Sequence, residues 1–261
     1  VWLVGSLAAV GLFFGFYTHL MLVVCFVVYL SIVNGGQDFM SFQWDILLLE
    51  VGFISIFISP SSSIIIYLFW FVLFKLMFMS GLVKLLSGDK AWQNLSALCY
   101  HYLTQPLPTR FAWHIHKLPK SIHKFSTGTM FAIELIIPFL FFVPGQIQAV
   151  AGLAVLLLMA LITLTGNYNI FTFLTASLTV FLFNNQLLLE YLPNQLIAWL
   201  REPVIFGDIF LNTYLIPTLS IFVVIVSIIY AVAKIRKDLP TYLLNVLRGV
   251  SSLKIVNTYG F

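Results

Sequence analysis

Lys75 is the residue whose type and position point most directly to chemistry. It lies near the middle of an apolar stretch, residues 64–86, that is long enough to cross a membrane. An ammonium at that depth costs about 2.5–3.5 kcal/mol, so it usually faces the interior of a helix bundle and has a partner there. We expect that partner to be Glu134, which also lies inside an apolar stretch, with Glu50 and Asp45 as alternatives. Such a pair would either hold helices together or supply an acid–base group inside the membrane.

The remaining ionisable residues of the apolar stretches are assigned smaller roles. Lys84 lies nine residues after Lys75, on the opposite helical face and near the end of its stretch, where an ammonium reaches the interface. Asp45 and Glu50 are five residues apart, about 140° around a helix, so they do not form a paired-carboxylate site by themselves. Together these residues are predicted to form an intramembrane charge network: Asp45, Glu50, Lys75, Lys84 and Glu134.

Histidines gather in the polar region 87–126, at positions 101, 114, 116 and 123. His114 and His116 cannot face one way on a helix, and no HExxH spacing is present, so ordinary hydrogen bonding is favoured over a metal site. His101 stands beside a proline-rich break and is the second candidate for acid–base catalysis, in a cavity at the membrane surface. The sequence has no P-loop, nucleophile elbow, dinucleotide fingerprint or CxxC pair, and we expect no metal and no cofactor.

The composition requires a lipid environment for the elements that carry these residues. Of 261 residues, 61% are hydrophobic and 8% are charged, whereas a soluble domain has about a quarter charged residues. The net charge is +4, and the basic residues flank apolar stretches, so anionic lipid head groups are expected as partners and nucleic acid is not. We therefore predict an all-α, polytopic transmembrane helix bundle in a lipid bilayer.

Six or seven spans are predicted from the apolar stretches. Residues 1–16 and 20–33 are separated by a short polar break, which favours a tight helical hairpin over one long tilted helix. Residues 39–59 would form a short span or a re-entrant helix. The other predicted spans are residues 64–86, 127–143, 147–164, 170–192 and 209–233.

The polar region 87–126 is predicted to contain helices that lie in the plane of the membrane interface. Gln105-Pro106-Leu107-Pro108 must break any helix, and residues 92–102 and 111–125 on either side mix aromatic, apolar and basic residues. We divide the chain into a transmembrane domain, residues 1–237, and a juxtamembrane tail, residues 238–261. Four crossings separate the polar region from the tail, so both are expected on one side of the membrane, and their basic residues favour the cytoplasm.

Read together, the polar motifs resemble those of the lipase maturation factor family. The resemblance runs from about residue 37 to residue 169 and again over the last five residues. The motifs include Phe42-Gln43-Trp44-Asp45, Lys75-Leu76-Met77, Tyr100-His101-Tyr102, Thr104-Gln105-Pro106-Leu107-Pro108-Thr109, Thr165-Gly166-Asn167-Tyr168-Asn169 and Asn257-Thr258-Tyr259-Gly260-Phe261. The polar-loop residues that belong to these and the neighbouring motifs are Asp89, Trp92, Tyr100, His101, Tyr102, Gln105, His116, Asn167, Tyr168 and Asn169.

The resemblance implies a multi-span protein of the endoplasmic reticulum membrane or, in bacteria, of the cytoplasmic membrane. It implies a non-enzymatic factor that assists the folding and assembly of exported client proteins such as lipases. A soluble domain normally follows the last motif, so residues 238–261 are expected to be its truncated start. The family's polar loop and tail are expected on the lumenal side, against the charge argument, and only their shared side is predicted.

A membrane-embedded enzyme is the alternative interpretation. The architecture weakly resembles the membrane domain of the vitamin K-dependent carboxylase, in which case Lys75 or His101 would act as acid or base on a lipid or quinone-like substrate. A transporter is less favoured, because the sequence shows no inverted repeat. The sequence leaves the client, the organism and the oligomeric state open.

Overall fold

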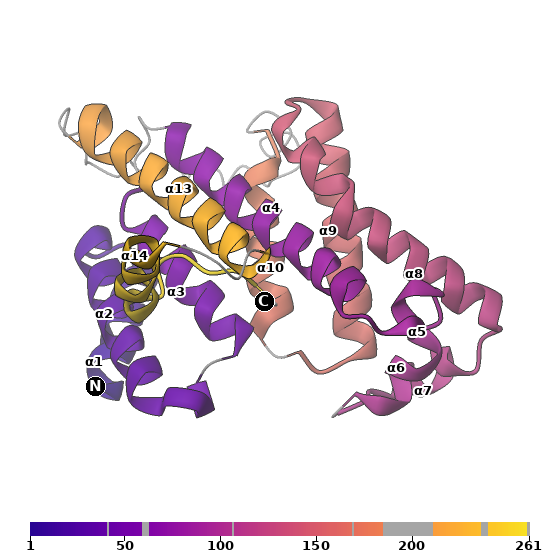
Figure 1. The fold of residues 1–261 in the computed structure, drawn as a ribbon. Coiled ribbons are helices and arrows are strands. Elements are labelled where there is room, and N and C mark those ends of the chain that lie inside the picture. The colour runs from indigo at the N-terminus through magenta and orange to yellow at the C-terminus, as the bar shows by residue number, and fades with distance from the viewer. Residues whose placement is uncertain are drawn as a thin grey trace. The chain divides into compact units, whose positions relative to one another are not determined.

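The computed structural model describes residues 1–40, 42–58, 63–105, 107–168, 170–184, 211–235 and 240–259. Within these ranges the regular structure is helical (Figure 1). Five helical segments among the described residues are long and apolar enough to cross a membrane, and Trp2–Phe13 and Ile170–Leu182 are shorter apolar segments. The five are Thr18–Met40, Ser63–Leu86, Lys120–Phe142, Gln146–Thr165 and Thr213–Ala233. The predicted all-α membrane bundle is confirmed.

The chain divides into two compact units, and unit 1 comprises Val1–Phe69 and Pro203–Thr258. Its described helices are α1 (Trp2–Phe13), α2 (Thr18–Gly36), the 3-10 turn η1 (Gln37–Met40), α3 (Gln43–Ser55), the π-helical turn η4 (Leu211–Leu215), α13 (Ile216–Ile235) and α14 (Thr241–Leu253). Helix α3 has 13 residues, about 20 Å, which is less than the roughly 30 Å of a bilayer core. It buries Asp45 and Glu50 together with Leu47, Leu49 and Ile54.

The hairpin predicted for the first 33 residues is present in unit 1. Helices α1 and α2 are separate and pack against each other. Gly15 and Tyr17 adopt positive φ angles of 76° and 42° in the turn between them. Gly5 allows a close approach, because a Cβ there would lie 2.9 Å from a methyl group of Val28. The chain reverses within a few residues, so one long tilted helix is excluded.

Unit 2 comprises Trp70–Glu202 and Tyr259–Phe261. Its described helices are α4 (Ser63–Leu86, which enters this unit at Trp70), α5 (Lys90–Gln93), α6 (Leu98–Thr104), α7 (Arg110–His116), α8 (Lys120–Leu135), η2 (Ile137–Phe142), α9 (Gln146–Thr165), α10 (Ile170–Thr179) and η3 (Val180–Leu182). Helix α4 contributes Val72, Leu73 and Leu76 to the core of this unit, each at most 1% exposed. The indole N–H of Trp70 donates to the Phe181 carbonyl at 2.7 Å and ties α4 to η3.

The polar region is divided differently from the prediction. The helix predicted over residues 92–102 is two short helices, α5 and α6, because the chain turns at Leu95 with φ of 57°. The helix predicted over residues 111–125 is cut at Pro119, which cannot continue a helix but suits the residue before one. Helix α8 therefore begins at Lys120, seven residues before the predicted start of that span. The end of the span predicted at residue 192 and the start of the span predicted at residue 209 lie outside the described residues.

Candidate functional site

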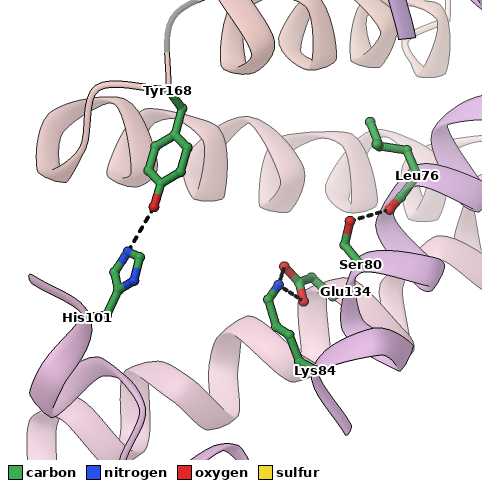
Figure 2. Close-up of polar contacts among 6 residues, drawn as sticks. All are labelled: Leu76, Ser80, Lys84, His101, Glu134 and Tyr168. Atoms are coloured by element: carbon green, nitrogen blue, oxygen red, sulfur yellow. Dashed lines mark hydrogen bonds and ion pairs between the residues drawn. The ribbon is translucent and has the colours of Figure 1, made fainter. Parts of the chain in front are cut away.

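An ion pair between Lys84 of α4 and Glu134 of α8 lies within unit 2 (Figure 2). The Lys84 Nζ is 2.5 Å from Oε1 and 2.6 Å from Oε2 of the carboxylate. The side chain of Glu134 is 6% exposed and that of Lys84 is 24% exposed. Both carboxylate oxygens are therefore used by Lys84, and the predicted pairing of Glu134 with Lys75 is wrong. Lys84, predicted both to reach the interface and to belong to the charge network, binds the buried carboxylate and keeps 24% of its side chain exposed.

Gly81 is the residue that brings the two partners together. A Cβ at this position would lie 2.8 Å from a methyl group of Leu135 and 2.9 Å from the Cβ of Glu134. Any larger residue would push α8 away from α4, so the glycine sets the separation at which Lys84 reaches the carboxylate. Trp92 lies beside the pair, with its ring centre 5.8 Å from the Lys84 Nζ. One turn before Lys84 on α4, the Ser80 hydroxyl donates to the Leu76 carbonyl at 2.7 Å, so its hydrogen bond stays within the helix (Figure 2).

Lys75 is buried as predicted, with 6% exposure, and its surroundings in unit 2 include two aromatic rings. Its Nζ lies 5.8 Å from the ring centre of Phe71 and 5.5 Å from that of Tyr259. These are distances at which a ring face attracts a cation. Tyr259 belongs to the last family motif and is itself 3% exposed. The C-terminal motif thus contacts the lysine at the middle of α4.

The two carboxylates of α3 are buried within unit 1, and each has a hydrogen-bonding side chain beside it. The Tyr29 hydroxyl donates to Oδ1 of Asp45, and Nδ2 of Asn257 lies 3.4 Å from Oε2 of Glu50. Asp45 is 2% exposed and Glu50 is fully buried. Sequence reasoning missed Tyr29, since an apolar helix with one tyrosine carries no signal of a carboxylate partner.

Two family motifs that are about 60 residues apart are joined by side-chain hydrogen bonds in unit 2. Gln105 Nε2 donates to the Thr165 carbonyl at 2.7 Å, and the Thr109 hydroxyl donates to the Leu164 carbonyl at 2.7 Å. In the other direction Asn167 Nδ2 donates to the Leu107 carbonyl at 2.8 Å. The last carbonyls of a helix lack intrahelical partners, and these bonds satisfy two of them at the end of α9. We call the group His101, Gln105, Thr109, Asn167 and Tyr168 the polar clasp.

The fourth bond of the polar clasp joins two titratable side chains. The Tyr168 hydroxyl lies 3.0 Å from His101 Nε2, and the planes of the two rings are nearly parallel, 11° apart (Figure 2). Burial lowers the pKa of His101 from its ordinary value, and the nearby Lys84 ammonium lowers it further. Burial raises the pKa of the Tyr168 phenol. Near neutral pH both groups are therefore uncharged, and the hydrogen bond joins a neutral phenol to a neutral imidazole.

Gly166 allows the polar clasp to close. A Cβ there would lie 2.4 Å from the Tyr168 ring and 2.7 Å from Oε1 of Gln105. An open groove of about 360 Å³ borders this turn and is lined by Thr163, Gly166, Asn167, Tyr168, Ile170, Thr172 and Phe173. The hydroxyls of Thr163 and Thr172 in its lining are 2.9 Å apart and form a hydrogen bond.

The other predicted polar-loop residues cap a helix, pack against other rings or are exposed. Asp89 caps α5 by accepting from the Ala91 N–H at 2.8 Å, and Tyr100 is 62% exposed. Tyr102 is buried with its ring 5.7 Å from that of His123, whose Nε2 lies 3.3 Å from the His116 carbonyl. Asn169 lies outside the described residues. Among the described residues, no three His, Cys, Asp or Glu side chains gather to hold a metal ion.

The candidate acid–base residues are in different surroundings. Lys75 lies among aromatic rings, and His101 is bonded to Tyr168 in the polar clasp. Both side chains thus have contacts that a purely structural role explains.

Comparison with known proteins agrees with the motifs. The family model described as the lipase maturation factor transmembrane domain matches residues 1–190, which includes the first 35 residues. Lipase maturation factor 2 of Gallus gallus is 41% identical over 181 residues, which are 64% of this chain and 25% of the relative. The protein of the same name from Xenopus laevis is 39% identical over 200 residues, 70% of this chain and 28% of the relative.

A second group of relatives matches less strongly. Lipase maturation factor 1 of Mus musculus is 32% identical over 168 residues, 60% of this chain and 29% of the relative. The chain thus spans about a quarter of the length of the curated relatives it matches. No solved structure matches the chain. With its five full-length candidate spans among the described residues and a family match over most of its length, this integral membrane protein belongs to the lipase maturation factor transmembrane domain family.

Proposed function

We propose that the chain is the membrane-embedded part of a maturation factor that assists the folding of exported proteins, with lipases as the client class. The match of the family model to residues 1–190 carries this proposal. The names of the relatives, lipase maturation factors 1 and 2, supply the client class. The proposal includes a position in the endoplasmic reticulum membrane or a bacterial cytoplasmic membrane.

The buried polar contacts support a scaffolding role in this proposal. Within unit 2 the Lys84–Glu134 pair joins α4 to α8, and the polar clasp attaches the polar region to the end of α9. Helices α5, α6 and α7 are thereby held at the ends of apolar helices, with side chains such as Tyr100 exposed. This arrangement suits presentation of a surface to a client and requires no reaction at Lys75 or His101. Residues 238–261 would then lead into a soluble domain that takes part in client binding.

A chimera tests the proposed function. In Gallus gallus lipase maturation factor 2, the matching segment would be replaced by the corresponding segment of this chain, in cells that lack their own maturation factors. Secreted lipase activity per mass of secreted lipase would be measured. We expect the chimera to restore active lipase, because the family match implies an equivalent membrane domain.

Two glycine variants of the chimera serve as a matched pair. Gly166→Ala opens the polar clasp and is expected to reduce secreted lipase activity. Gly52→Ala, where a Cβ meets nothing within 4 Å, is expected to leave it unchanged. A chimera that reaches the membrane in normal amount, melts like the parent protein and yields no active lipase would overturn the proposal.

A further inference from the structure

Residues 90–133 carry a concentrated positive charge. They include five Lys or Arg residues and no Asp or Glu. The carboxylates at the two edges of the segment are already used, since Asp89 caps α5 and Glu134 binds Lys84. Lys117, Lys120 and Lys124 are all exposed, and no carboxylate among the described residues forms an ion pair with them. The charge of this segment is therefore available to an external anion.

Large apolar side chains are interleaved with these cations. Phe111 is 57% exposed, Trp113 53% and Phe125 76%. The Lys117 Nζ lies 3.1 Å from the centre of the Trp113 ring, so one cation rests directly on an aromatic face. We call these six exposed residues of α7, α8 and the turn between them the basic–aromatic segment: Phe111, Trp113, Lys117, Lys120, Lys124 and Phe125.

The helix geometry separates charge from apolar surface on α8. Lys120 and Lys124 are four residues apart and lie on one side of the helix. His123 and Thr127 are buried beside them, whereas Phe125 projects from a different side. A partner with only polar groups would bind Lys120 and Lys124 but would leave the Phe125 ring exposed to water. A lipid head group with its attached acyl region satisfies both.

The position of α8 identifies the anion. Lys120–Phe142 is itself long and apolar enough to cross the membrane, so its first two turns lie where a crossing begins. Trp and basic residues at that depth meet head groups and glycerol backbones. Each Lys or Arg near an anionic membrane surface contributes about 1 kcal/mol to the attraction. The phosphate of a phospholipid is thus the nearest abundant anion to Lys117, Lys120 and Lys124.

We infer that the basic–aromatic segment is a binding site for anionic phospholipid. The ammonium groups of Lys117, Lys120 and Lys124 bind the negatively charged head group through its phosphate. Phe111, Trp113 and Phe125 enter the interfacial layer beside it. The site is independent of client maturation, and a chain with no effect on lipases would still have it.

The test measures lipid binding by the detergent-solubilised chain. Mixed micelles that contain phosphatidylglycerol or phosphatidylcholine would be titrated, and both the apparent Kd and the melting temperature recorded. The triple variant Lys117→Gln, Lys120→Gln, Lys124→Gln is expected to bind phosphatidylglycerol roughly 10- to 100-fold more weakly than the natural chain. The matched triple Lys→Arg variant keeps the charge and is expected to bind as well as the natural chain. Equal melting temperatures in phosphatidylcholine would show that all three proteins are folded.

Two further arms separate the possible sources of the anion. Inorganic phosphate at millimolar concentration is expected to give no stabilisation, because it lacks the apolar part that meets Phe111, Trp113 and Phe125. An acidic peptide is expected not to displace phosphatidylglycerol. Equal affinity for the two lipids, an unchanged affinity in the Gln variant, or displacement by the acidic peptide would each overturn the inference, the last in favour of a protein partner.

Discussion

At the scale of single residues, the deeper partner of the Lys84–Glu134 pair is the carboxylate. The Glu134 side chain, at the contact of α8 with α4, is 6% exposed, whereas that of Lys84 is 24% exposed. Removing one partner of a buried pair leaves the other charge without compensation, which costs about 3–5 kcal/mol. The cost should be larger when the remaining charge is the one that cannot reach water.

We therefore predict an asymmetric response to substitution of the pair. Lys84→Met leaves the buried carboxylate alone and should lower the melting temperature more than Glu134→Gln, which leaves an ammonium that can turn outward. The double variant should recover part of the loss. Thermal unfolding in one detergent would measure all three. Equal losses in the two single variants would show that the two charges are equally buried.

His101 makes the stability of the polar clasp dependent on pH. Its pKa is lowered in the folded state by burial and then by the Lys84 ammonium, so the folded chain binds a proton less readily than the unfolded chain. The stabilisation is complete above the ordinary histidine value of about 6.5 and declines as the pH falls through the lowered pKa. The melting temperature of the natural chain should fall between pH 7.5 and pH 5.5.

A variant isolates this contribution from that of the other histidines. His101→Gln stays uncharged and still reaches the Tyr168 hydroxyl, so its melting temperature should fall less over the same pH interval. The difference between the two proteins at each pH is the quantity to measure. A constant difference from pH 7.5 to pH 5.5 would contradict the assignment to His101.

At the scale of elements, the contact between α4 and α8 depends on a glycine in the helix interior. A Cβ at Gly81 would lie too close to Leu135 and Glu134, at 2.8 and 2.9 Å. A Cβ at Gly128 of α8 would lie at an ordinary contact distance, 3.8 Å from its nearest atom. The two glycines are otherwise similar, since both lie inside helices of unit 2. Alanine substitutions at these two glycines therefore separate the steric effect of an added methyl group from its effect on helix propensity.

Alanine at these two positions should have opposite effects on stability. Gly81→Ala should destabilise by about 1–3 kcal/mol, because the added methyl group pushes α8 outward and lengthens the Lys84–Glu134 pair. Gly128→Ala should be neutral or stabilise by up to about 1 kcal/mol through helix propensity. Melting temperatures in the same detergent decide this, and a stabilising Gly81→Ala would mean that α8 has room to move.

At the scale of the whole molecule, the C-terminal motif returns to the centre of α4 within unit 2. Tyr259 is buried and its ring faces the Lys75 ammonium.

Substitutions at Tyr259 test how strongly this motif is attached. Tyr259→Ala removes a buried ring and a cation–π contact and should destabilise by about 3–5 kcal/mol. Tyr259→Phe keeps the ring and should lose less than half of that. Thermal unfolding would be followed together with proteolysis near the C-terminus, which should become faster only in the Ala variant. Similar behaviour of the two variants would show that the hydroxyl, not the ring, matters.

The sequence by itself determined the solvent, the helical class, the family and the burial of Lys75. These follow from local properties, since apolar length requires a bilayer and a charge within such a stretch requires shelter. The hairpin of α1 and α2 was predictable for the same reason, because a few polar residues between two apolar stretches are enough to end one helix and turn the chain. The helix start at Lys120 was also visible in Pro119, although the prediction placed the span later.

Only the tertiary structure decided which partner each charge has. Lys84 rather than Lys75 binds Glu134 because Gly81 brings α8 close at that level, and one sequence does not show where two helices touch. The polar clasp joins motifs about 60 residues apart, and three of its four bonds end on backbone carbonyls that have no sequence signature. Hydrogen bonds act over about 3 Å, so their partners depend on how the chain is packed and not on which residues it contains.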